Sequence, residues 1–127
     1  MIICKMSLTA ARQTGDRRIE AIHLNNLGYT CWRHGELEKA LSYYEQSLLI
    51  HRELVNREEE GITLNNLAGI YEEQGKYDLS LQKYQKSLTI AQETGDREGT
   101  GTTLNNIGLV YRRQGDNETA LQYYKQA

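Results

Sequence analysis

Three pairs of adjacent asparagines return along the chain at equal spacing: Asn25-Asn26, Asn65-Asn66 and Asn105-Asn106. An amide side chain both donates and accepts hydrogen bonds, so a line of amides can hold a peptide backbone without selecting particular side chains. Inside a helix, an asparagine is about 0.6 kcal/mol less favourable than an alanine, so six of them need an offsetting interaction. The pairs therefore predict either a polar binding surface or hydrogen bonds between neighbouring helices.

Reactive side chains are few. Cys31 and His34 lie three residues apart, which could bring a thiol close to an imidazole, but no third group is placed to orient the histidine. The run Glu58 to Glu60 is typical of acidic residues in the first turn of a helix, where the helix dipole favours them. The glycine-rich stretch "REGTGTT" lacks the lysine of a phosphate-binding loop. We expect no enzymatic activity, no metal site and no cofactor.

The asparagine pairs belong to a longer repeat of 40 residues. Several other residues keep the same phase: Gly35, Gly75 and Gly115; Leu41, Leu81 and Leu121; Tyr44, Tyr84 and Tyr124. A fixed period in the range of about 20 to 50 residues is typical of solenoids, whose units bury their apolar faces against each other. Each unit is expected to contain a helix, a glycine turn, a second helix and a loop.

The first helix of each unit shows a helical spacing of apolar residues. Leu24, Leu27, Gly28 and Cys31 lie at i, i+3, i+4 and i+7, and the pattern returns from Leu64 and from Leu104. Small residues at one phase of each helix should allow the two helices to approach closely: Gly28, Ala68 and Gly108 in the first, and Ala40, Ser80 and Ala120 in the second. Glycines are expected to end helices at 15, 35, 75, 95 and 115, and Asp16, Asn56 and Asp96 to act as N-caps.

These patterns predict an all-α fold, an α-solenoid (right-handed superhelix) of antiparallel helix pairs. Residues 1–127 should form a single array, with the second helix of a partial repeat at 1–14, repeat 1 at 16–54, repeat 2 at 56–94 and a truncated repeat 3 at 96–127. Both ends would then be uncapped, so the chain is expected to be a fragment of a longer array or a homo-oligomer formed through its terminal helices.

Composition favours a soluble, cytoplasmic protein. A formal net charge of -2 argues against nucleic acid as a partner, and 39% hydrophobic residues can supply a core. No apolar run approaches the roughly 18 residues of a membrane span. Two cysteines, Cys4 and Cys31, make no disulfide framework and are expected to be small buried side chains in a reducing compartment.

The repeat resembles a known family. Leu64, Leu67, Ala68, Tyr71, Gly75, Ser80 and Tyr84 match the tetratricopeptide pattern W-x2-L-G-x2-Y…A-x3-F…P, with Leu for the first Trp and no closing Pro. The period is 40 residues rather than 34, and this extended form with "LNNL" in the first helix is most similar to the repeats of kinesin light chains and of polarity adaptors. The resemblance implies a non-enzymatic scaffold that binds a partner protein in a concave groove.

The resemblance also indicates which residues would line that groove. On each first helix the asparagines lie on a polar face, about 100° or more away from the core. The expected peptide-binding residues are Asn25, Tyr29, Trp32, Asn65, Asn66, Glu72, Asn105, Leu109 and Arg112. Two alternatives stay open: Asn26, Asn66 and Asn106 could instead bond to neighbouring helices, and Trp32 could pack at the end of the stack. The second functional hypothesis is a structural or oligomerising module of a larger regulatory protein.

Overall fold

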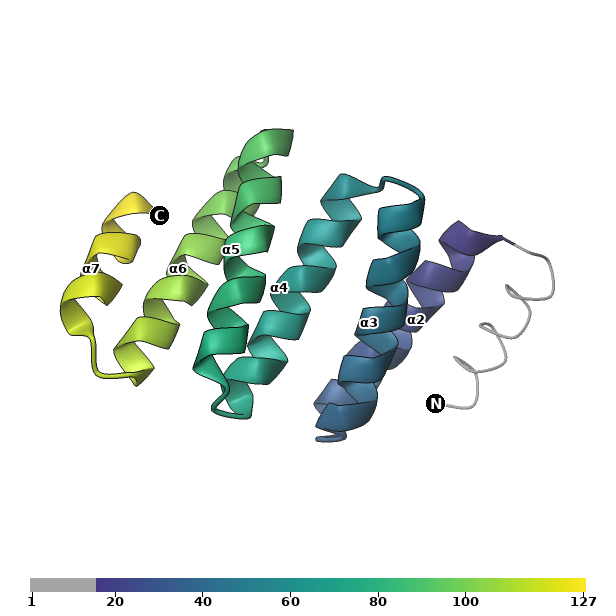
Figure 1. Cartoon of the computed structure of the whole chain (residues 1–127), viewed down its shortest axis with the longest axis horizontal. Helices are drawn as coiled ribbons and strands as arrows, with labels where there is room; N and C mark the ends of the chain where they lie inside the picture. Colours follow the sequence, from purple (N-terminus) through teal and green to yellow (C-terminus); the bar gives the residue numbers. More distant parts are fainter. Residues whose placement is uncertain (1–15) are drawn as a thin grey trace. The chain divides into compact units, whose positions relative to one another are not determined.

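The computed structural model describes residues 16–127, which are helical throughout apart from short turns (Figure 1). The helices are α2 (Arg17–Arg33), α3 (Leu37–Glu53), α4 (Arg57–Glu73), α5 (Tyr77–Thr94), α6 (Arg97–Arg113) and α7 (Asn117–Gln126). The expected all-α helical repeat is confirmed, and no strand occurs in residues 16–127. The second helix expected at 1–14 lies outside the described residues.

The chain divides into two compact units, residues 1–59 and 60–127. The described part of the first unit contains α2, α3 and the start of α4, and the second unit contains the rest of α4 with α5, α6 and α7. Helices α2 and α3 fall in the expected repeat 16–54, α4 and α5 in 56–94, and α6 and α7 in 96–127. The limits of the repeats themselves remain predictions.

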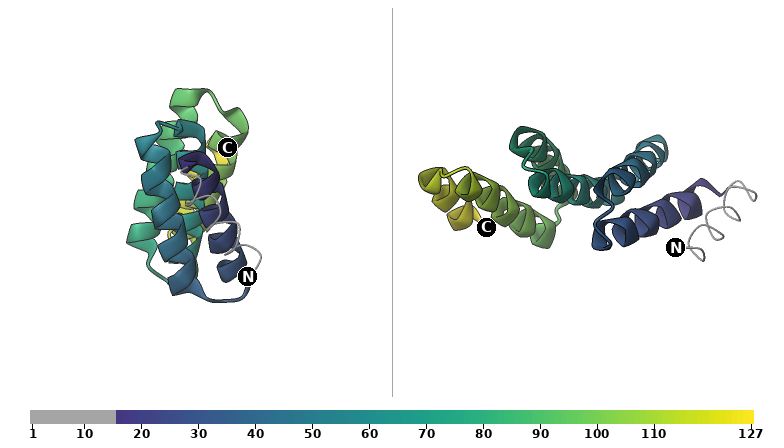
Figure 2. Two further views of the ribbon diagram at one scale, coloured as in Figure 1. Left: turned by 90° about the vertical axis from the view of Figure 1, so that its right-hand side faces the viewer. Right: turned by 90° about the horizontal axis from the view of Figure 1, so that it is seen from below.

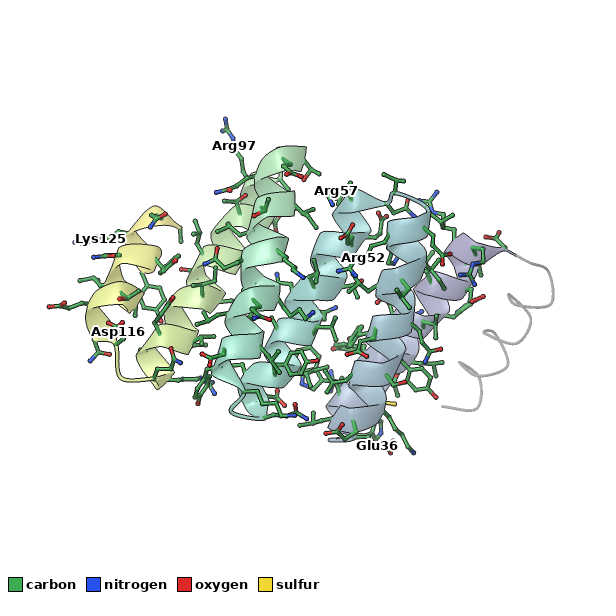
Figure 3. The ribbon with its side chains drawn as sticks, in the orientation of Figure 1. Glu36, Arg52, Arg57, Arg97, Asp116 and Lys125 are labelled. Atoms are coloured by element: carbon green, nitrogen blue, oxygen red, sulfur yellow. The ribbon has the colours of Figure 1, made fainter. Side chains whose placement is uncertain are left out.

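Glycine and aspartate set the ends of most helices as expected. Gly35, Gly75, Gly95 and Gly115 all have φ between 72° and 87°, the left-handed conformation that ends a helix. The N-cap aspartates of α2, α6 and α7 each accept a hydrogen bond from a backbone N–H in the first turn: Asp16 from Ile19 (3.1 Å), Asp96 from Gly99 (2.9 Å) and Asp116, which was not among the predicted caps, from Thr119 (3.1 Å). Asp116 is visible at the start of α7 in Figure 3.

The loop between α3 and α4 departs from this rule. Val55 occupies the phase of Gly95 and adopts φ 56°, which is the only positive φ of a non-glycine residue in the described part of the chain. The left-handed conformation brings Cβ close to the following carbonyl oxygen and costs roughly 1–2 kcal/mol. Helix α4 begins at Arg57, so Asn56 stands at the expected N-cap position.

Val55→Gly is therefore expected to raise the free energy of unfolding by about 1 kcal/mol, since glycine relieves the strain but adds entropy to the unfolded chain. Little burial is lost, because Val55 is 72% exposed. Chemical denaturation of the two proteins measures the difference. A variant less stable than the wild type would show that the valine side chain contributes more than its backbone strain costs.

In the first unit, α2 and α3 pack closely where the sequence predicted it. A Cβ added at Gly28 would stand 3.0 Å from the ring of Tyr44, so the glycine leaves room for that ring. Ser47 on α3 donates a hydrogen bond of 3.0 Å to the carbonyl of Ala21 on α2. The buried apolar cluster between the two helices contains Ala21, Leu24, Leu27 and Ile50.

The second unit repeats these contacts. Ser87 on α5 donates to the carbonyl of Gly61 on α4 (2.8 Å), and Ser80 donates to that of Ala68 (2.9 Å). Helices α6 and α7 pack against each other, as the right-hand view of Figure 2 shows, and a Cβ at Gly108 would meet the Tyr124 ring at 2.7 Å. The core of this unit joins residues of α4, α5 and α6: Ala68, Tyr84, Leu88, Leu104, Ile107 and Val110.

Candidate peptide-binding face

Asn65 joins the first helices of neighbouring repeats in the second unit. Its amide Nδ2 on α4 donates to the Thr103 hydroxyl on α6 (3.4 Å), and its Oδ1 accepts from the Asn106 Nδ2 on α6 (3.3 Å). Both asparagines are half-buried. The sequence left open that the second asparagine of each pair bonds to a neighbouring helix. In this unit such bonds are made by Asn106, which is a second asparagine, and also by Asn65, which is a first one.

The other two asparagines of this unit differ. Asn66 is half-buried and Asn105 is exposed, and neither side chain has a hydrogen-bond partner among residues 16–127. Their amides are consequently the ones that remain open. The sequence could not predict which asparagine of a pair bonds to another helix. Two adjacent asparagines have the same side chain, and only a rotation of 100° about the helix axis separates their positions.

In the first unit, Asn25 bonds to the second helix. Its Nδ2 lies 3.4 Å from Nε2 of His51 on α3, and only 1% of His51 is exposed. Because an amide nitrogen can only donate, the Nε2 atom accepts this hydrogen bond. Sequence reasoning missed His51 as a partner, since a single histidine on a second helix carries no spacing signal. Asn26 is exposed.

An exposed aromatic ring and a cation lie one helical turn apart on α2. The guanidinium of Arg33 stands 5.8 Å from the centroid of the Tyr29 ring and donates a hydrogen bond of 3.2 Å to the Tyr29 hydroxyl. This hydroxyl raises the pKa of Arg33. Tyr29 is 52% exposed, and Trp32 is half-buried beside it on the helix. Tyr29 and Arg33 thus place an aromatic ring beside a cation on the exposed side of α2.

Glu72 takes a different place from the one expected. The sequence placed it on the ligand face, but its side chain is only 8% exposed in the described structure. Oε2 lies 3.0 Å from Nε of Arg113 on α6, and Oε1 accepts a hydrogen bond of 3.3 Å from the Tyr84 hydroxyl on α5. Burial raises the pKa of Glu72, while Arg113 and the Tyr84 hydroxyl oppose that rise. Glu72 thus ties α4, α5 and α6 together.

Helix α6 carries a stripe of the expected site residues. Asn105, Leu109 and Arg112 lie at i, i+4 and i+7, so they share one side of the helix. Leu109 is half-buried and Arg112 is exposed. Arg112 forms no ion pair or hydrogen bond with residues 16–127, in contrast to its neighbour Arg113. The stripe therefore offers an amide, an aliphatic surface and an unpaired guanidinium.

A shallow hollow lies between α5 and α6. It is lined by Asp78, Leu81, Gln82, Gln85, Lys86 and Tyr111. The Tyr111 ring stacks on Tyr123 with centroids 5.5 Å apart, and Gln85 donates to the Tyr123 hydroxyl (3.3 Å). Lys125 projects from the far side of α7 (Figure 3).

Cys31 is fully buried, as expected of a core position, and His34 donates from Nδ1 to the Thr30 carbonyl (2.8 Å). Residues 16–127 contain no cluster of three His, Cys, Asp or Glu side chains able to hold a metal ion. Within the same range, no helix is long and apolar enough to cross a bilayer.

Paired helices with glycine turns, a buried small residue at each crossing and a 40-residue period define a helical repeat protein. The tetratricopeptide repeat model matches residues 3–53 and 59–127. The chain belongs to the tetratricopeptide repeat family. No curated protein sequence matches it.

Solved structures agree with this assignment. The TPR domain of Arabidopsis FLU is 26% identical, with a TM-score of 0.81, covering 87% of this chain and 92% of that one. The TPR-like repeats of a putative kinesin light chain from Podosopora anserina are 14% identical with a TM-score of 0.81, covering 97% and 61%. A Rap protein complexed with Competence and Sporulation Factor is 18% identical with a TM-score of 0.67, covering 97% and 44%. At these identities the last two show the fold alone.

Proposed function

We propose that the chain is a non-enzymatic interaction module that binds a peptide segment of a partner protein on the exposed faces of its first helices. One observation carries the proposal: each unit places an apolar side chain beside an accessible arginine on that face. These are Tyr29 with Arg33 on α2, and Leu109 with Arg112 on α6. Tetratricopeptide repeats generally mediate protein–protein interaction, and the Rap protein of this fold was solved with Competence and Sporulation Factor.

The side chains of the two pairs indicate which chemical groups the ligand should carry. A tyrosine ring and a leucine side chain gain energy by covering aliphatic or aromatic groups, at about 25 cal/mol per Å² of buried apolar surface. A guanidinium one turn away binds a carboxylate, with two parallel hydrogen bonds where the geometry allows. The favoured ligand is therefore a segment that alternates apolar and acidic side chains.

Each unit also carries an exposed apolar residue on the polar face of a first helix. Ile22 on α2 is 45% exposed and Ile62 on α4 is 53% exposed, and both have the phase of the polar face rather than of the core. In the second unit, the interhelical bonds of Asn65 fix α4 against α6 without occupying Leu109 or Arg112. Asn65 and Asn106 then act as positioning residues, whereas the open amides of Asn66 and Asn105 can still contact the ligand.

A peptide selected on the wild-type chain from a random library tests this proposal. Its affinity, measured by fluorescence anisotropy, is expected to fall about tenfold or more for Tyr29→Ala or for the double variant Leu109→Ala/Arg112→Ala, since apolar and arginine anchors carry much of an interface's energy. Leu79→Ala is the matched control, because Leu79 is 40% exposed on the second helix α5. Equal affinity for all folded variants would contradict the proposal.

A further inference from the structure

The bond network of Asn65 supplies a template for contact between first helices. Asn65 donates to the residue 38 positions later, Thr103, and accepts from the residue 41 positions later, Asn106. The receiving helix, α6, thus contributes one acceptor, the Thr103 hydroxyl, and one amide donor, that of Asn106, three residues apart. A first helix with an acceptor and an amide at these two phases has the groups needed for the same two bonds.

Asn105 repeats the donor side of this template. Asn105 lies 40 residues after Asn65 and so occupies on α6 the position that Asn65 occupies on α4. It lies on a different side of α6 from Thr103 and Asn106, which face α4. Its amide is exposed and has no hydrogen-bond partner among residues 16–127.

Helix α2 repeats the receiving side. His23 and Asn26 have the phases of Thr103 and Asn106, 80 residues earlier. A neutral imidazole nitrogen can accept from an amide as the threonine hydroxyl does. His23 is half-buried and Asn26 is exposed, and neither side chain makes a hydrogen bond within the described range.

We propose that α6 of one chain binds α2 of a second copy, with Asn105 bonded to His23 and Asn26 of that copy. Apolar surface accompanies these bonds: Ile19 and Ile22 are 43% and 45% exposed on α2, close to His23. Two different faces meet, so the contact is heterologous and can add further copies head to tail. The test of this association is separate from the peptide-binding test, because it uses no peptide and changes none of Tyr29, Leu109 and Arg112.

Complementation between two variants tests the proposal. Asn105→Arg and Asn26→Arg each place a bulky cation on one of the two faces, at an exposed position where folding should not suffer. By sedimentation velocity over a concentration series, the wild type is expected to form assemblies larger than one chain, and each variant alone to remain a monomer. An equimolar mixture should form a dimer, since one variant keeps an intact α6 face and the other an intact α2 face.

Thr89→Arg is the control, since Thr89 is exposed on α5 and bonds only to the backbone of its own helix, at the carbonyl of Gln85. It should associate as the wild type does. A wild-type chain that stays monomeric at every concentration would overturn the proposal. Variants that associate as strongly as the wild type, or a mixture that stays monomeric, would also overturn it. Circular dichroism checks that every variant is folded.

Discussion

Tyr44→Ala is expected to lower the free energy of unfolding by about 4 kcal/mol, the range of large aromatic truncations in cores. Only 1% of Tyr44 is exposed, and its ring fills the space that Gly28 leaves on α2. Since proteins of this size are typically stable by about 5–15 kcal/mol, this one change should remove a large part of the total. Urea denaturation followed by circular dichroism measures the loss.

Two phenylalanine variants separate the ring from the hydroxyl. The Tyr44 hydroxyl is buried without a hydrogen-bond partner in the described structure, and burial raises its pKa to about 12, with smaller contributions from Tyr29 and Cys31. Tyr44→Phe should therefore match or exceed the wild type in stability. Tyr84→Phe should lose about 1 kcal/mol, because the Tyr84 hydroxyl donates to Glu72. A Tyr44→Phe variant as unstable as Tyr44→Ala would contradict this account of the ring.

Arg113→Met is expected to destabilise the fold by about 2 kcal/mol at neutral pH, because it leaves the buried carboxylate of Glu72 without its cation. The two groups lie 3.0 Å apart, and Glu72 is 8% exposed whereas Arg113 is 49% exposed. Methionine keeps most of the apolar stem. Arg112→Met is the matched control, since Arg112 has no ion pair in residues 16–127 and its loss should change stability little.

The effect of Arg113→Met should depend on pH. Burial already raises the pKa of Glu72 above its ordinary value of 4.5, so ionisation of this group opposes folding. Without Arg113 the folded-state pKa rises further, and the added loss of stability is fully present above that pKa. This added loss of stability should disappear as the pH falls toward 4.5, where Glu72 becomes protonated in both the folded and the unfolded state. A difference between variant and wild type that is constant with pH would contradict the ion pair's role.

The fold could be predicted from sequence because each local signal repeats at the same phase. Three apolar stripes, four glycines at the ends of helices and the N-cap aspartates all indicate one arrangement of helix pairs, and the structure confirms them. The valine at position 55 was the exception. Only the backbone shows that this residue takes the left-handed conformation of Gly95.

The site was harder to predict because it depends on partners from other helices. Glu72 has the phase of Trp32 and Arg112, so its spacing predicts a position on the ligand-binding surface. In the structure, Tyr84 and Arg113 reach it from α5 and α6 and hold it in the interior. Likewise, nothing in the spacing of Asn65 reveals that Thr103 and Asn106 use both ends of its amide.

Mapping a selected peptide onto the chain by backbone amide chemical shifts shows directly whether the first helices bind the ligand. We expect perturbations on α2 around Tyr29 and on α6 around Leu109 and Arg112, with little change at exposed Leu49 and Leu79 on the second helices α3 and α5. Perturbations concentrated around Leu49 and Leu79, with α2 and α6 unchanged, would contradict the proposed function.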